Sequence, residues 1–272
     1  MIFENPRIPE GINSGRRRPL RDLAVLGGGV GALLALTVVL FLVLAQLLGP
    51  SVPFSWERAL AGSDDPHRVP EGRQEAALAA LGQRVAAAMD LPDGMEIEFH
   101  LLDLDTVNAF ATLGGHVFVT TAMIGALPNE NALAWVLAHE IAHVRHRDPM
   151  RGASTGMLLG LLGALVTGDS GIGNLVVGSG GMVGALHFSR QREEAADAAG
   201  LPALLSLYGH VGGYRDALDA LRPMAEAEGE PPVMLASHPH LDVREERLEA
   251  LIAAQGWPVL PDRVPLAAEL GM

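Results

Sequence analysis

The sequence predicts an α+β fold that is mostly helical, with a small β-sheet and one N-terminal transmembrane helix. Three observations predict it. A long apolar run without charged residues lies near the N-terminus, at residues 23–49. Residues 96–101 and 108–121 contain short stretches of alternating or β-branched residues, which indicate strands. In most of the remaining chain the apolar residues recur with helical spacing, so helices dominate.

The composition restricts the class of protein. Hydrophobic residues make up 49% of the 272 residues and the mean hydropathy is +0.25, which is high for a wholly soluble chain. The net charge of -13 argues against nucleic acid as a partner, because binding to phosphates needs concentrated positive charge. The chain has no cysteine, so a bound metal would depend on His, Asp or Glu ligands.

The apolar run at residues 23–49 predicts a single-pass membrane anchor, because at about 1.5 Å per residue it exceeds the roughly 30 Å hydrocarbon core. A cleaved signal peptide is the alternative, since residues 43–45 suit a cleavage site, but signal-peptide apolar regions are usually about 7 to 15 residues long. Five arginines precede the run: Arg7, Arg16, Arg17, Arg18 and Arg21. The positive-inside rule therefore predicts a cytoplasmic segment at residues 1–22, an anchor in a bacterial inner membrane, and a periplasmic domain.

The chain after the anchor is predicted to divide into a linker, one domain and a tail. Residues 50–72 are rich in Pro, Gly, Ser and charged residues, which is typical of a tether. The domain is expected at residues 73–256 and the tail at residues 257–272. The domain begins with a helix at residues 73–90, where apolar residues recur with helical spacing.

Two stretches predict the sheet of the domain. In residues 96–101 three apolar residues alternate with two glutamates and a histidine, as in a half-buried strand. Residues 108–121 predict two strands around Gly114 and Gly115, because glycine tolerates the positive φ that a two-residue hairpin turn requires. A small antiparallel or mixed sheet is therefore expected.

Asn129 is predicted to cap a helix that ends at Asp148-Pro149. Residues 157–188 are apolar and rich in glycine, and they predict either buried helices or a hairpin that dips into the membrane. Further helices are predicted at residues 189–200, 213–227 and 242–255.

The segment His139-Glu140-Ile141-Ala142-His143 places two histidines on one face of the helix after Asn129. Residues four apart project to the same side, so both imidazoles can bind one ion at about 2.0 to 2.1 Å. Glu140 lies about 100° round the helix from His139, beside the ion, where the general base for an attacking water belongs. The pattern alone also fits a polar patch on an amphipathic helix.

A catalytic zinc needs three protein ligands and one open position. The best candidates for the third ligand are Glu193 and Asp197, which stand four apart on the helix predicted at residues 189–200. One of them can bind the ion while the other supports a ligating histidine. The alternative is that this charged run forms a solvated helix face.

Four ordered segments resemble the HtpX-like family of membrane-associated zinc metalloendopeptidases, which includes BepA, LoiP and the CAAX prenyl endopeptidases. The segments are NAFATLGGHVFVTTAMI, ALAWVLAHEIAHVRHRD, SRQREEAAD and SHPHLDVREERLEAL. The resemblance covers residues 73–255. It implies a gluzincin-type, zincin-like metallopeptidase domain that holds one zinc ion, with a small sheet whose edge strand lies over the active-site cleft.

The resemblance also implies roles for individual residues. Glu193 becomes the third zinc ligand, in preference to Glu194, and Asp197 becomes the partner of a zinc-binding histidine. His238 is expected near the metal, where it either stabilises the oxyanion or closes the site as a reversible extra ligand. A loop histidine without a role is the alternative for His238.

The expected activity is hydrolysis of peptide bonds, with Glu140 as the general base. The backbone from Gly115 through His116 and Val117 to Val119 is expected to offer an unpaired strand edge to an extended substrate. Such binding favours unfolded or misfolded envelope and membrane proteins, which suits protein quality control. A non-catalytic or self-plugged chaperone or scaffold of the same fold is the alternative. A CAAX-prenyl-type protease is disfavoured, because such enzymes have several spanning helices.

The remaining histidines are predicted to be surface or packing residues: His67, His100, His116, His146, His187 and His210. Fewer than twenty residues follow Gln255, so no C-terminal helical-repeat domain of the BepA kind is expected. The oligomeric state is not predicted.

Overall fold

The computed structural model describes residues 18–61, 72–152, 190–226, 234–235, 238 and 241–271. The chain forms two compact units, residues 1–43 and residues 44–272. The segment at residues 157–188, predicted to form buried helices or a hairpin, lies outside the described residues.

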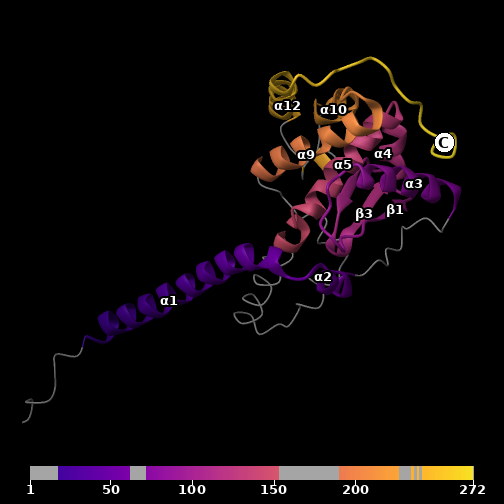
Figure 1. Ribbon diagram of the computed structural model, residues 1–272. Coiled ribbons are helices and arrows are strands. Elements are labelled where there is room, and N and C mark those ends of the chain that lie inside the picture. Colours follow the sequence, from indigo (N-terminus) through magenta and orange to yellow (C-terminus); the bar gives the residue numbers. More distant parts are fainter. Residues whose placement is uncertain are drawn as a thin grey trace, which may run out of the picture. The chain divides into compact units, whose positions relative to one another are not determined.

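Helix α1, Pro19–Leu48, contains the predicted anchor (Figure 1). It begins at a proline, which is favoured in the first turn because its missing N–H has no partner there. Its Pro19–Phe41 part is apolar and 23 residues long, and none of it is buried inside the protein. This part is long and apolar enough to cross a membrane.

A short helix, α2 (Phe54–Leu60), follows the 3-10 turn at Gly49–Ser51 and packs inside the second unit, against the turn at Leu113–Gly115. Its Glu57 is 1% exposed, accepts a hydrogen bond from the Gly114 N–H at 3.1 Å and pairs with Arg147 at 2.8 Å. The prediction that residues 50–72 form a tether is therefore wrong for residues 54–60, which form the packed helix α2. Composition alone gave no sign that this glutamate has buried partners.

The sheet has three strands in the order β1-β3-β2. Strand β1 (Glu98–Leu102) pairs parallel with β3 (His116–Thr120), and β2 (Ala109–Ala111) pairs antiparallel with the other side of β3. Gly114 and Gly115, which precede β3, have φ values of 79° and 86°. The predicted hairpin and the positive φ of its glycines are confirmed, and the sheet is mixed. The connection is longer than a two-residue turn, because a 3-10 turn at Leu113–Gly115 lies between the strands.

The topology corrects the expected substrate edge. Strand β3 is central, so its hydrogen-bonding groups from His116 onward, including those of Val117, already pair with β1 and β2. The turn residue Gly115 lies against Glu96, where a Cβ would come within 2.2 Å of the carbonyl oxygen. The prediction of an unpaired edge here is wrong, because β1, which precedes the hairpin in the chain, pairs with the side of β3 that β2 leaves open.

One face of the sheet joins the core. Phe99 and Val117 are register partners on this face, and both are buried. Helix α3 (Arg73–Ala87) packs closely on it, because Gly82 leaves room for the Phe99 ring; a Cβ there would lie 2.5 Å from that ring. His100 points to the opposite face but is only 2% exposed, so β1 is not the half-buried strand that its alternation predicts.

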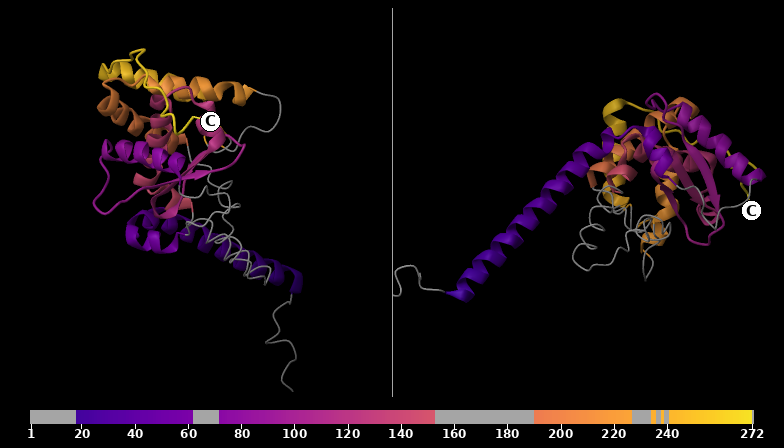
Figure 2. Two further views of the ribbon diagram at one scale, coloured as in Figure 1. Left: turned by 90° about the vertical axis from the view of Figure 1, so that its right-hand side faces the viewer. Right: turned by 90° about the horizontal axis from the view of Figure 1, so that it is seen from below.

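Helix α5, Glu130–Arg145, is the centre of the domain, and every residue from Glu130 to Val144 is buried. Asn129 caps it by accepting a hydrogen bond from the Ala132 N–H at 2.9 Å, which confirms the predicted start. The described chain also contains α4 (Thr121–Ala126), α9 (Arg190–Tyr208), α10 (Gly213–Glu226) and α12 (Leu241–Gln255), and residues 148–152 are helical as well. Figures 1 and 2 show α9, α10 and α12 grouped together on the side of α5 away from the sheet.

Candidate metal centre

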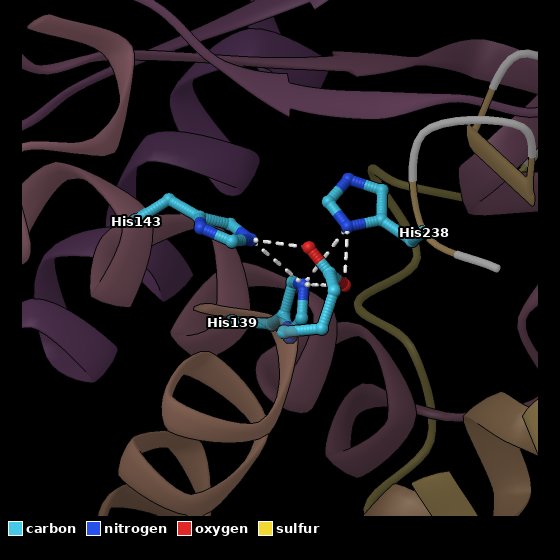
Figure 3. A group of neighbouring side chains, drawn as sticks. His139, His143 and His238 are labelled. Atoms are coloured by element: carbon cyan, nitrogen blue, oxygen red, sulfur yellow. Dashed lines mark hydrogen bonds and ion pairs between the residues drawn. The ribbon is translucent and has the colours of Figure 1, made fainter. Parts of the chain in front are cut away.

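Two histidines of α5 project to one side of the helix, as their spacing predicts. The Nε2 atoms of His139 and His143 lie 3.1 Å apart, and both side chains are at most 1% exposed. Figure 3 shows both rings directed into one small space. Because a metal bound by imidazole uses one ring nitrogen, the two Nε2 atoms are placed to share an ion.

Helix α9 places Glu193 against both rings. Its Oε2 lies 3.4 Å from Nε2 of His139, and its Oε1 lies 3.4 Å from Nε2 of His143. Glu193 is 3% exposed, whereas the side chain of the next residue, Glu194, is 36% exposed and pairs with Arg247. The helix therefore directs Glu193, and not Glu194, to the histidines.

His238 is the fourth member of the group. Its Nδ1 lies 2.7 Å from Oε2 of Glu193 and 3.2 Å from Nε2 of His139, and the residue is 1% exposed (Figure 3). One donor atom from each of the four side chains lies within 4.8 Å of the other three. The group thus joins α5, α9 and the segment before α12, with three imidazoles and one carboxylate.

The ring nitrogens that face away from the group have carboxylate partners. Nδ1 of His139 lies 2.9 Å from Asp197, and Nδ1 of His143 lies 3.0 Å from Asp148. Such partners fix the orientation of a metal-binding imidazole and raise its basicity. The sequence predicts Asp197 in this position, but Asp148 was interpreted only as part of the helix stop.

Arg244 of α12 is a further residue that the sequence analysis missed. It donates two hydrogen bonds to Asp197, from Nε at 2.8 Å and from Nη2 at 2.6 Å, and it is 5% exposed. Its guanidinium also lies over the Trp135 ring, 5.6 Å from the ring centre. Arg244 therefore holds Asp197 in place for His139, and it links α12 to both α9 and α5.

The carboxylates of the group stay ionised although they are buried. Burial alone would raise the pKa of Asp197, but Arg244 and the His139 ring outweigh burial and lower it to about 2. Burial likewise opposes ionisation of Glu193, yet hydrogen bonds from the surrounding imidazoles hold its pKa far below the usual range. Burial would lower the pKa of His139, but Asp197 and Glu193 raise it to about 9. The two carboxylates thus stay ionised and attract positive charge.

Glu140 lies beside the group and is 0% exposed. Its Oε1 is 3.8 Å from Nε2 of His238, and neither of its carboxylate oxygens has a hydrogen-bond partner among the residues that the structure describes. A buried carboxylate without hydrogen bonds costs free energy. A metal ion at the histidines, together with a water on that ion, would satisfy it, so the residues present fit a metal centre.

Comparison with known proteins agrees with this arrangement. The beta-barrel assembly-enhancing protease of Yersinia pestis is 31% identical over 159 residues, which are 54% of this chain and 32% of that protein. A protease HtpX homolog of Acidiphilium cryptum is 36% identical over 132 residues, or 47% of this chain and 40% of that protein. The mitochondrial metalloendopeptidase OMA1 of Saccharomyces cerevisiae is 36% identical over 118 residues, or 41% of this chain and 33% of that protein.

The chain spans about a third of the length of the beta-barrel assembly-enhancing proteases that it matches. The sequence model of Peptidase family M48 matches residues 72–252, which include α3, the whole sheet and all four members of the donor group. This match covers well over half of the sequence and agrees with the predicted HtpX-like resemblance. The chain belongs to Peptidase family M48.

Proposed function

We propose that the chain is a membrane-anchored zinc metalloendopeptidase that hydrolyses unfolded or misfolded envelope proteins. The observation that carries the proposal is the position of Glu140, a buried carboxylate without hydrogen-bond partners among the described residues, beside a group of metal-ligand side chains. A structural metal site is closed by its protein ligands and needs no further carboxylate, whereas a hydrolytic site needs a general base beside the metal to accept a proton from water.

Zinc is proposed because of the donor set. Two imidazoles and one carboxylate, from His139, His143 and Glu193, are the ligands of several catalytic zinc sites, and they leave a fourth position open. A zinc ion there would polarise the scissile carbonyl and make a coordinated water more acidic.

The residues of the chain perform the proton transfers. Glu140 is the group that would accept a proton from the attacking water and deliver it to the leaving amine. With a metal bound, Asp197 and Asp148 would accept the Nδ1 protons of the two imidazoles and so leave Nε2 of each ring available for the ion. Arg244 in turn fixes Asp197 through its paired hydrogen bonds.

The position of His238 suggests that the proteolytic activity is regulated. Its Nδ1 lies in the donor group itself, 2.7 Å from Glu193. A histidine in that position can serve as a fourth zinc ligand and so occupy the place of the water. We therefore propose that His238 closes the site reversibly. Permanent closure would give the second candidate function, a non-catalytic chaperone or scaffold.

Replacement of His238 by Ala is expected to raise the rate of proteolysis, because the side chain that competes with water for the fourth zinc position is removed. It is also expected to weaken zinc binding, because one of the four ligands is lost. The measurements are cleavage of unfolded casein and the zinc dissociation constant, with His240→Ala as the matched control. Lower activity with unchanged zinc affinity would instead assign His238 to oxyanion stabilisation. No change in either quantity would remove it from the mechanism.

The substrate edge is proposed to be β2 and not β3. Strand β2 pairs with β3 on one side, and no other strand of the described chain pairs with its second side. It also packs against α5, the helix that carries His139 and His143. An extended peptide that adds to β2 would be bound mainly through its backbone, which favours unfolded chains over a defined sequence.

The proposed location follows from α1 and the arginines before it. The N-terminus is proposed to lie in the cytoplasm and the M48 domain in the periplasm. The names of the Yersinia and Acidiphilium relatives, a beta-barrel assembly-enhancing protease and an HtpX homolog, support a role in quality control of the bacterial envelope.

The experiment that tests the proposed function is cleavage of unfolded casein by the full-length chain in detergent. Cleavage is expected to stop when a chelator removes the metal and to return when zinc is restored. Cleavage that persists without metal would contradict a metallopeptidase. If neither the native chain nor His238→Ala cleaves casein when loaded with zinc, the scaffold alternative is favoured.

A further inference from the structure

A second group of potential metal ligands lies on the sheet. Glu98 and His100 of β1 and His116 of β3 each have a donor atom within 4.8 Å of the others. None of these residues belongs to the metal centre. The register explains the grouping: Glu98 pairs with His116 across the two strands, and His100 lies two residues beyond Glu98 on the same face.

From this arrangement we infer a second binding site for a divalent cation, with zinc as the best-fitting ion. Two imidazoles and a carboxylate suit zinc. A tetrahedral zinc ion with bonds of roughly 2.0 to 2.2 Å separates its ligand atoms by about 3.3 to 3.6 Å. Here Nε2 of His100 is 2.9 Å from Nδ1 of His116, which is 3.5 Å from Oε2 of Glu98. In the metal centre the corresponding distances are 3.1 and 3.4 Å.

The surroundings of His100 resemble those of the metal-centre histidines only in part. Its Nε2 faces the donor group, and its Nδ1 lies 3.9 Å from the carboxylate of Glu75 on α3. His139 and His143 have the same order of donor group, imidazole and carboxylate. Those two histidines lie within hydrogen-bond distance of their outer carboxylates, whereas the separation of Nδ1 of His100 from Glu75 exceeds that distance, so Glu75 lies near the ring without fixing it.

The burial of the group supports binding and also gives access. His100 and His116 are 2% and 6% exposed. The Phe118 ring lies against His100, with 4.8 Å between the ring centres, and so keeps this side apolar. The Glu98 side chain is 46% exposed, which opens the group to solvent on one side. A cation can therefore enter at Glu98 and reach two preformed imidazoles.

Arg58 is the competing cation at this place. It lies 3.4 Å from Glu98, but its closer partner is Glu96, at 2.6 Å. Both pairs are partly exposed, and such pairs contribute little to stability. A zinc ion can therefore take Glu98 while Arg58 remains paired with Glu96.

The test measures the number of zinc ions bound per full-length chain in detergent, at increasing buffered concentrations of free zinc. The native chain is expected to bind two zinc ions at saturation. One zinc ion per chain would overturn the inference and leave His100 and His116 as a simple hydrogen-bonded pair. This count does not depend on proteolysis, so it can fail while the proposed function holds.

Two glutamine variants locate the second ion. Glu98→Gln is expected to raise the dissociation constant of the second zinc ion more than about tenfold. Mutation of a residue that only orients a metal ligand already lowers metal affinity about 10- to 100-fold. Glu249→Gln is the matched control, since Glu249 is also half exposed and pairs with an arginine, Arg215, but lies outside the donor group. It is expected to leave both ions bound. Equal zinc affinities in the two variants would overturn the assignment.

Discussion

Replacement of Glu140 by Gln is expected to lower kcat/KM for casein cleavage at least about 100-fold, because general acid–base catalysis contributes about 10²- to 10⁴-fold. The amide has nearly the same shape as the carboxylate but cannot accept the proton. Zinc binding should be retained, since Glu140 is not a member of the donor group. The measurements are the rate of cleavage and the zinc content of the same sample.

Loss of folding would not explain this result. A buried carboxylate without hydrogen-bond partners costs free energy, so metal-free Glu140→Gln should unfold at the same temperature as the native chain or higher. Glu130→Gln is the matched control: Glu130 is also buried on α5, but it pairs with Arg84 and Tyr208. It should lose stability and keep its activity. Undiminished cleavage by Glu140→Gln would remove the base from the mechanism.

Local patterns explain what the sequence predicts well. The cap at Asn129 and the four-residue spacing of His139 and His143 are properties of a single helix, so they need no knowledge of the fold. Glu193 and His238 are far from that helix in the sequence. Glu193 was one of two candidates from its helical spacing, and the family resemblance chose it over Asp197. His238 was expected only because of the resemblance, and the structure brings all four side chains together.

Tertiary packing explains what the sequence analysis missed. Gly200 and Pro202 are typical of a helix end, yet α9 continues to Tyr208 because its buried face packs on α5. In the same way, the pairing of β1 with β3 depends on residues far apart in the sequence, so the loss of the β3 edge was not predictable from the hairpin alone.

The missed polar partners have the same origin. Asp148 was interpreted as a helix stop, and Arg244 had no role beyond its place in the helix predicted at residues 242–255. Both residue types are usually exposed. Here both are buried, and each acts on a ligand histidine or on its partner. Glu57 is a third case, since it is buried by Gly114 and Arg147 in a stretch whose composition is typical of a linker.

Replacement of Glu193 by Ala is expected to lower the zinc affinity of the metal centre more than about tenfold. The reason is that loss of a direct ligand should lower metal affinity at least as much as loss of a residue that only orients a ligand. His238 can partly compensate, since its Nδ1 lies 3.2 Å from Nε2 of His139. The comparison therefore uses the dissociation constant and not the occupancy at excess zinc. A Glu193→Ala/His238→Ala double variant should bind zinc more weakly still.

Glu194→Ala is the matched control, because Glu194 is the next residue on α9 and pairs with Arg247 at the surface. The measurement that most directly tests the central claim, that two histidines of α5 and one carboxylate of α9 bind a single zinc ion, is the zinc dissociation constant of these two variants. A large loss of affinity in Glu193→Ala and none in Glu194→Ala is predicted. Equal affinities, or a larger loss in Glu194→Ala, would contradict the claim.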